Sequence, residues 1–336
     1  MFPVSPSEKL QTIADAILKL SDYYINNPLA ETPWHKKYCQ IAYRHYYLPL
    51  NFIRCEKVIE RGLQVNFFEN LTHFIDWGAG PGTASLALAK SVKLKAQIKK
   101  QVLFDLSKST MNQFSDLHVD FINKDYFDFL DLRTDYPNKQ NSCLLFSYSL
   151  TEVTTLPAGW DEYEALMILE PSTSQDGRKL LNLRQNLIEN GYTIWAPCTH
   201  QQSCPLLNHS KNDWCHDRAH VAAPKWFNDL EQLLPMKNKT VTTSYLLARK
   251  RKPKEKSEEK TSEIISAKAR LTGDSLNEKG KTRQLICRND QREFLTWMHK
   301  TIEPQIIARG ELIDLPTDFE IKSNELRLKN PLKIPN

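Results

Sequence analysis

The spacing of apolar residues changes along the chain and predicts helices first, then short strands. Residues 6–27 place an apolar side chain at every third or fourth position, which is typical of an amphipathic helix. Residues 35–62 predict a second helical region, and Pro49 should kink or split it because proline cannot donate a backbone hydrogen bond. The apolar positions of the first helix are Leu10, Ile13, Ile17, Leu20 and Tyr24.

Between residues 71 and 196, short apolar runs alternate with helical patterns, as they do in a parallel α/β sheet. A last strand of this sheet is expected at 241–248. Beyond it, two strands around 266–271 and 282–287 and a helix over 290–310 are expected. The six earlier strands are expected at 73–77, 101–105, 119–122, 143–148, 166–170 and 191–195.

Composition gives a few indications of the partner and location of the protein. A net charge of +5 and a pI of about 8.7 favour an anionic partner such as RNA. No apolar run approaches the roughly 18 residues of a membrane helix, and the first residues do not resemble a secretory signal. The seven cysteines are not spaced as a secreted disulfide framework, so a reduced, cytoplasmic location is expected.

The segment HFIDWGAGPGTASLALAK, residues 73–90, contains the most informative motif. A buried strand, three glycines at alternate positions and a helix follow one another. The spacing D-x-G-x-G-x-G resembles motif I of class I S-adenosylmethionine (SAM) methyltransferases, whereas a dinucleotide site requires G-x-G-x-x-G. A glycine-rich turn without a ligand is the alternative. The residues expected to contact SAM here are Asp76, Gly78, Gly80 and Gly82.

Two further acids follow expected strands. Asp105 is placed to accept hydrogen bonds from a ribose diol, although it could simply cap a helix that begins near Ser107. Asp125 is expected near the adenine amino group, with a surface loop as the alternative. The fourth strand ends in Ser147, Tyr148 and Ser149. Such enzymes present catalytic residues there, but no N/D-P-P-Y motif is present, so the catalytic residues are not identified.

Three cysteines fall close together in the loop 196–220: Cys198, Cys204 and Cys215. Their spacing is not that of a C-x-x-C finger, so spacing alone is moderate evidence for a metal. A fourth ligand would complete a tetrahedral zinc site or an iron–sulfur cluster. His200 and His216 are local candidates for this ligand, and Cys287 is the distant one.

Two segments are candidates for RNA contact. Residues 249–262 carry seven basic and three acidic residues, which suits either a solvated linker or an arm that contacts phosphates. The aromatic residues of region 35–62 are expected to pack on the next domain, and an RNA-contacting face is the alternative.

Several motifs together resemble one family, the ribosomal small-subunit methyltransferase-like family, which includes the mitochondrial small-subunit assembly factor and its bacterial relatives. The resemblance covers about residues 35–310, and its most specific part is the run A-P-C-x-H…C-P…W-C-H. It implies a SAM-binding domain, a [4Fe-4S] cluster and binding to small-subunit rRNA during assembly. The cluster ligands it implies are Cys198, Cys204, Cys215 and Cys287. The chain departs from the family at 170–177, reading E-P-S-T-S-Q-D-G where the family reads E-P-G-T-P-x-G.

The expected fold class is therefore α/β, a class I SAM-methyltransferase (Rossmann-like) sheet with additions at both ends. Domains are expected at 1–70 (helical), 71–248 (methyltransferase-like), 249–262 (charged linker) and 263–336 (a small β/α unit). SAM-dependent methylation of rRNA is the first expected function. A non-catalytic rRNA-binding assembly factor is the second, and a methyltransferase with a zinc site and another substrate is the third. A monomer is expected.

Overall fold

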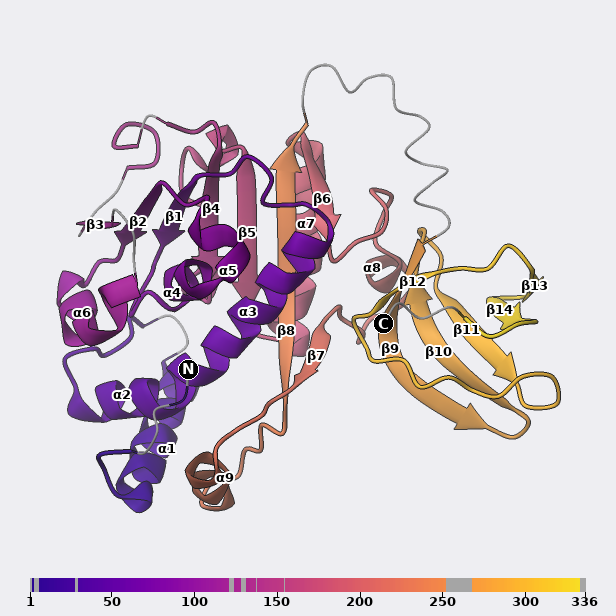
Figure 1. Ribbon diagram of the computed structural model, residues 1–336, viewed down its shortest axis with the longest axis horizontal. Coiled ribbons are helices and arrows are strands. Elements are labelled where there is room, and N and C mark those ends of the chain that lie inside the picture. The colour runs from indigo at the N-terminus through magenta and orange to yellow at the C-terminus, as the bar shows by residue number, and fades with distance from the viewer. Residues whose placement is uncertain are drawn as a thin grey trace. The chain divides into compact units, whose positions relative to one another are not determined.

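The computed structural model describes residues 2, 6–27, 30–120, 124–127, 131–136, 138–153, 155–251 and 268–332. The chain forms two compact units (Figure 1). The first contains Met1–Glu170 and Ala219–Thr242, and the second contains Pro171–Arg218 and Thr243–Asn336. The domain limits expected at residues 70, 248 and 262 remain predictions about which segments fold independently.

The first unit begins with the expected helices. Apolar side chains of α1 (Leu10–Asn26) pack with Tyr46 and with Phe227 of α9 (Lys225–Gln232). The second helical region comprises α2 (Lys37–Ala42), the π-helix η1 (Tyr43–Tyr47) and α3 (Leu48–Gln64). Tyr46 and Phe52 are buried, which supports the packing interpretation of the aromatic residues.

Pro49 does not break the helix at its own position. It lies in the first turn of α3, directly after a π-helical turn, whose wider hydrogen-bond spacing accommodates a residue without an amide hydrogen. The irregularity lies one turn earlier, in the π-helical turn η1.

Five parallel strands of the first unit follow the order β3-β2-β1-β4-β5, which confirms the α/β fold class. Both faces of the central strands are buried, so these strands read as continuous apolar runs. The strands are β1 (His73–Trp77), β2 (Lys100–Phe104), β3 (Lys124–Phe127), β4 (Ser142–Ser147) and β5 (Ala165–Glu170). The remaining elements of Met1–Glu170 are α4 (Thr83–Lys90), α5 (Val92–Lys95), α6 (Lys108–Gln113), η2 (Ser115–Asp120), η3 (Leu150–Glu152) and η4 (Trp160–Glu162).

The third strand was predicted at the wrong place. Residues 115–120 form the 3₁₀ helix η2, and residues 121–122 lie outside the described ranges. The strand is residues 124–127, which pair with β2 in the register Gln101↔Lys124. A short apolar run does not distinguish a strand from a helical turn, and here pairing with β2 decides the position.

In the second unit, α7 (Ser174–Glu189) precedes β6 (Tyr192–Ala196), and β6 pairs antiparallel with β8 (Thr240–Lys250). The loop after β6 contains α8 (Pro205–His209) and leads into β7 (Asp217–His220). A six-stranded sheet follows in the order β12-β9-β10-β11-β14-β13. Its strands are β9 (Lys268–Glu278), β10 (Lys281–Cys287), β11 (Glu293–Met298), β12 (Leu312–Asp314), β13 (Phe319–Lys322) and β14 (Glu325–Leu328).

The helix predicted over 290–310 is wrong, because this segment contains the strand β11. Leu295 and Trp297 point into the core of the sheet, whereas Phe294 belongs to a second apolar cluster. A strand with both faces buried carries apolar residues at consecutive positions, and part of that pattern also matches a helix. Over the described residues 268–332, the regular elements are therefore strands, rather than the predicted strand pair followed by a helix.

Across the described ranges, none of the helices has the length and apolar character that a bilayer span requires. All seven cysteines lie in those ranges, and none of them forms a disulfide. The cytoplasmic location remains a prediction.

Candidate cofactor sites

The glycine turn after β1 has the backbone that its sequence predicts. Gly78, Gly80 and Gly82 have φ angles of 70°, 52° and 73°, in the left-handed region that residues with a Cβ rarely adopt. Gly82 immediately precedes α4, and the turn is held to β2 by a hydrogen bond from Ala79 N to Phe104 O of 2.8 Å. The turn thus lies at the carboxyl ends of parallel strands, where doubly wound proteins bind ligands.

Two side chains approach the turn so closely that only glycine fits. A Cβ atom on Gly78 would lie 2.7 Å from Cβ of Ser149, which follows β4. A Cβ atom on Gly80 would lie 3.2 Å from Cζ2 of Trp34, which precedes α2. The Ser149 hydroxyl is buried and has no hydrogen-bond partner among the described residues. Ser149 thus follows the strand at whose end catalytic residues were expected, whereas Trp34 is a neighbour of the predicted SAM site that no sequence motif marks.

Asp76 uses only one of its two carboxyl oxygens within the protein. Its Oδ2 accepts hydrogen bonds from Ser85 N (3.2 Å) and Ser85 Oγ (2.7 Å) in the first turns of α4. Its Oδ1 is buried and has no partner among the described residues. Burial raises the pKa of Asp76 to about 6, and the bonds from Ser85 oppose that rise.

Asp105 connects the end of β2 to the glycine turn. Its Oδ2 accepts from Gly80 N at 2.8 Å, and its Oδ1 accepts from Ser107 N at 2.8 Å. Burial raises its pKa above the ordinary value of an aspartate. Ser107 directly precedes α6, so this bond is a local turn contact and does not decide between the capping and ribose interpretations. The ribose role remains a prediction, since each carboxylate oxygen can accept a second hydrogen bond.

Asp125 lies apart from the other predicted SAM residues. It is inside β3, opposite Val102, rather than in a loop at the carboxyl end of the strand. Its carboxylate forms an ion pair with Lys100. The misplaced third strand explains this difference, because a strand at 119–122 would have left Asp125 in the following loop.

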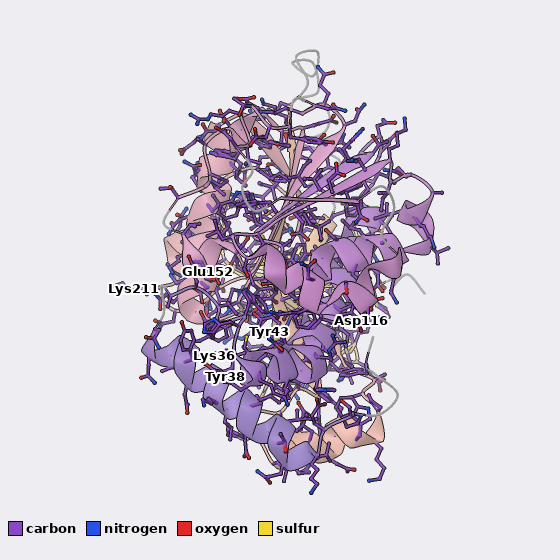
Figure 2. All side chains as sticks on the ribbon, turned by 90° about the vertical axis from the view of Figure 1, so that its left-hand side faces the viewer. Lys36, Tyr38, Tyr43, Asp116, Glu152 and Lys211 are labelled. Atoms are coloured by element: carbon purple, nitrogen blue, oxygen red, sulfur yellow. The ribbon has the colours of Figure 1, made fainter. Side chains whose placement is uncertain are left out.

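An aromatic and acidic group surrounds the turn, and its members come from the N-terminal region and from η3. The ring centroids of Trp34 and Tyr43 are 4.5 Å apart, and Tyr43 Oη lies 3.0 Å from Tyr24 Oη. Glu152 Oε1 accepts a hydrogen bond of 3.3 Å from Thr32 (Tyr43 and Glu152 are labelled in Figure 2). Although Glu152 keeps contact with solvent, the surrounding protein desolvates its carboxyl and raises its pKa to about 7. No sequence motif marks these residues.

The four predicted cluster cysteines line one cavity in the second unit. Cys198 follows β6, Cys204 precedes α8, Cys215 precedes β7 and Cys287 ends β10. The cavity has a volume of about 20 Å³, and much of its remaining lining is apolar. Burial raises the pKa of the Cys215 thiol to about 11, so without a metal this thiol is protonated at neutral pH. The fold therefore brings together three local cysteines and the distant one.

The cysteine side chains are not arranged as metal ligands. Within the described residues, no group of three or more His, Cys, Asp or Glu side chains has metal-binding geometry. Cys198 Sγ accepts a hydrogen bond of 3.0 Å from Arg184 Nε, and Cys287 Sγ lies 3.4 Å from His200 Nε2. His216 Nδ1 instead lies 3.2 Å from Arg309 Nη2. Of the two candidate histidines, only His200 is in hydrogen-bond contact with a candidate cysteine.

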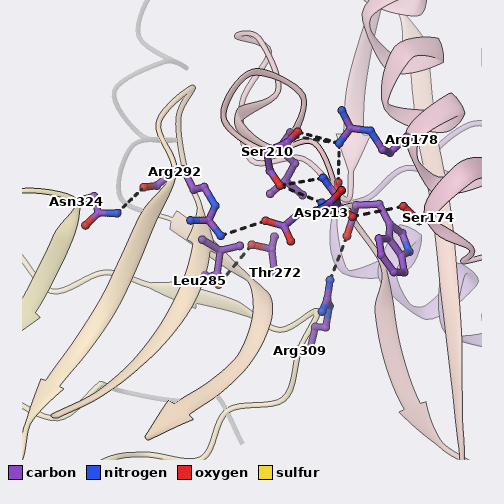
Figure 3. Close-up of polar contacts among 12 residues, drawn as sticks. Ser174, Arg178, Ser210, Asp213, Thr272, Leu285, Arg292, Arg309 and Asn324 are labelled. Atoms are coloured by element: carbon purple, nitrogen blue, oxygen red, sulfur yellow. Dashed lines mark hydrogen bonds and ion pairs between the residues drawn. The ribbon is translucent and has the colours of Figure 1, made fainter. Parts of the chain in front are cut away.

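Arginine side chains hold the loop that carries Cys204 and Cys215 (Figure 3). Arg178 of α7 donates to three carbonyl oxygens of this loop, at distances of 2.9 to 3.4 Å. Arg309 donates to Trp214 O and His216 O, on either side of Cys215. Arg292 pairs with Asp213 at 3.1 Å. The loop is thus fixed by charged hydrogen bonds, independently of any bound metal.

The segment that departs from the family pattern forms the start of α7. Thr173 caps this helix and accepts a hydrogen bond of 3.0 Å from Asp176 N. Gly177 lies in the helix, and a Cβ atom there would be 2.4 Å from Cδ1 of Trp214. Trp214 also donates to Ser172 O at 2.9 Å. The glycine is therefore required by close packing against the residue that precedes Cys215.

Gly177→Ala is expected to lower the free energy of unfolding by about 1–3 kcal/mol, because the methyl group overpacks the contact with Trp214. Urea denaturation measures this change. In a Trp214→Ala background the clash is absent, and the same substitution should stabilise the helix slightly. An equal loss in both backgrounds would contradict the packing role of Gly177.

One protein family matches more than half of this chain. Residues 38–300 match the family described as mitochondrial small ribosomal subunit Rsm22. A comparison with curated proteins gave no match.

Among solved structures, the plantazolicin methyltransferase BamL is 11% identical, with 72% of this chain and 98% of that chain covered and a TM-score of 0.38. The ribosomal protein L11 methylase of Lactobacillus delbrueckii subsp. bulgaricus is 13% identical, with coverages of 59% and 78% and a TM-score of 0.32. The TYW2 protein of M. jannaschii, solved with AdoMet, is 13% identical, with coverages of 57% and 68% and a TM-score of 0.30. Similarities this low do not establish a shared function. The family match covers well over half of the chain, and the protein therefore belongs to the Rsm22 family.

Proposed function

We propose that this protein is a SAM-dependent methyltransferase-like protein that binds small-subunit rRNA during ribosome assembly and carries a structural [4Fe-4S] cluster. Membership of a family described by the small ribosomal subunit supports the ribosomal partner. The single observation that supports SAM most directly is the glycine turn with two unsatisfied buried oxygens, Asp76 Oδ1 and Ser149 Oγ, on residues beside it. Buried polar atoms are normally hydrogen-bonded, so a polar ligand is expected at this place.

The residues that would hold SAM are Asp76, the three glycines of the turn and Asp105. When bound, SAM supplies a methyl group on a positively charged sulfur. Burial raises the pKa of Glu152 and the nearby Asp105 carboxylate raises it further, so a cation bound near these two acids would be stabilised. Trp34 is positioned to cover the turn.

A non-catalytic assembly factor remains the second candidate function, and one observation favours it. Ser147 at the end of β4 is directed to the buried thiol of Cys55, with 3.8 Å between Oγ and Sγ, rather than to a substrate. No catalytic residue is therefore assigned.

The residue types around the cysteine cavity suit a thiolate-bound metal group, which would require the thiols to move into ligand geometry. Four thiols line it, and Arg184, which contacts one of them, has a buried Nη1 without a partner among the described residues. Thiolate ligands suit iron–sulfur clusters and zinc equally well. The family resemblance favours [4Fe-4S], and a zinc site that includes His200 is the alternative. Either group would join the loop after β6 to β10 and act as a structural link.

Anaerobic purification followed by iron, sulfide and zinc analysis tests the metal, and a SAM titration of the same preparation tests the cofactor. Iron with sulfide and a brown absorbance band are expected, together with saturable SAM binding. Zinc without iron would replace the cluster by a zinc site. Absence of both metals and of SAM binding would overturn the proposal.

The contact with rRNA is proposed for the basic tract after β8, with one change imposed by the structure. Arg249 is buried in β8 with its guanidinium 5.3 Å from the ring centroid of Trp195, so it is not available to phosphates. Lys250 and Arg251 are exposed, and residues 252–262 lie outside the described ranges.

Replacing Lys250, Arg251 and Lys252 by glutamine is expected to weaken binding to small-subunit rRNA. The slope of log affinity against log salt should fall by about 0.7–0.9 for each phosphate that the variant no longer neutralises. Filter binding over a salt series measures both quantities. The control replaces three lysines that are exposed elsewhere, Lys93, Lys95 and Lys300. If the two triple variants behave alike, the tract is only a solvated linker.

A further inference from the structure

Arg184 is a buried cation next to the cysteine cavity. It lies on α7, is 1% exposed, and donates from Nε to Cys198 Sγ at 3.0 Å. Its Nη2 donates to His200 O at 2.8 Å. Its Nη1 is buried and has no hydrogen-bond partner among the described residues. One guanidinium therefore contacts both a candidate ligand and the backbone of the loop beside it.

A fully buried guanidinium requires a compensating negative charge, because the loss of hydration is costly. A thiol and a carbonyl oxygen are neutral, and a thiol is a weak acceptor. Arg270, the arginine among the residues that line the cavity, already has a carboxylate partner in Asp217. No ion pair with an Asp or Glu side chain is found for Arg184 among the described residues. The missing anion is thus expected on the side of Cys198.

A metal group bound by four thiolates supplies such an anion, since the ligand charges outweigh the cationic core. We propose that Arg184 is the counter-ion of this group, a positioning residue that donates hydrogen bonds to the Cys198 thiolate and the adjoining sulfur atoms. This inference rests on the proposed thiolate-bound metal. A cation beside an iron–sulfur cluster stabilises its reduced, more negative state, so Arg184 raises the midpoint potential.

The test compares wild type with Arg184→Met, Arg184→Lys and Arg178→Met, all purified anaerobically. Arg178 lies on the same helix, and the hydrogen bonds it donates to described residues all go to loop carbonyls, so its replacement reproduces a structural loss without removing a charge from the cysteines. The readouts are the midpoint potential from a redox titration and the rate of metal release to a chelator. For a zinc form, the release rate alone applies.

Arg184→Met is expected to shift the reduction equilibrium at least tenfold towards the oxidised form, about 59 mV for one electron, and to release metal at least tenfold faster. Arg184→Lys keeps the charge and should retain most of the potential, which gives a second measurement if the methionine variant does not fold. Arg178→Met should leave the potential unchanged. Wild-type potential and release rate in both Arg184 variants would overturn the role of Arg184. A wild-type protein without metal would instead overturn the proposed site on which this role rests.

Discussion

Replacing Cys287 by serine is expected to abolish the metal group and to lower the free energy of unfolding by more than about 4 kcal/mol, because loss of a metal is one of the few changes that destabilise this strongly. Cys287 ends β10, whereas the other three candidate ligands lie in the loop after β6, so of the four candidate ligands it is the one that the six-stranded sheet contributes. Iron and sulfide analysis, the absorbance spectrum and denaturant unfolding measure the two effects. Limited proteolysis should also show faster cleavage after residue 262.

Cys55→Ser is the matched control for this experiment. Cys55 is fully buried in the first unit and lies near the Ser147 hydroxyl, so a serine there has a hydrogen-bond partner. Its metal content should equal that of wild type. If Cys287→Ser retains all its metal, Cys287 is not a ligand, and His200 becomes the fourth ligand to test.

The central strands were predictable because burial on both faces forces an uninterrupted apolar run. Five of the six strands predicted before residue 200 are found within one residue of their limits at both ends. The exception is β3, which lies at the edge of the parallel set. The strand was predicted within the run HVDFI, residues 118–122, whose pattern also resembles the apolar side of a helical turn. Strand β11 was missed for a related reason, since its burial on both faces removes the alternation that identifies strands.

In the candidate sites, residues within a local motif were predictable, whereas residues brought close by tertiary packing were not. The positions of Gly78, Gly80 and Gly82 were predictable, because a left-handed turn between strand and helix has a local signature. The proximity of Trp34 to the turn was not predictable, because it depends on how segments remote in sequence pack. Arg184 was recognisable only as part of a basic helix, and its burial beside Cys198 could not be inferred from its neighbours in sequence.

Gly80→Val is expected to weaken SAM binding at least about 100-fold, equivalent to about 2.8 kcal/mol, if the glycine turn binds SAM as proposed. A branched side chain at this position would press against Trp34, and the φ angle of 52° would be strained. Isothermal titration calorimetry measures the affinity, and circular dichroism establishes that the variant is folded.

The control for this prediction must separate backbone strain from loss of the site. Gly280 has a φ angle of 82° and open space around its Cβ position, in the turn between β9 and β10. Gly280→Val therefore carries the same kind of strain, about 1–2 kcal/mol, without altering the glycine turn. We expect it to lose stability and to keep wild-type SAM affinity. If Gly80→Val binds SAM as tightly as Gly280→Val does, the glycine turn is not the SAM site, and the two unsatisfied oxygens of Asp76 and Ser149 must have another partner.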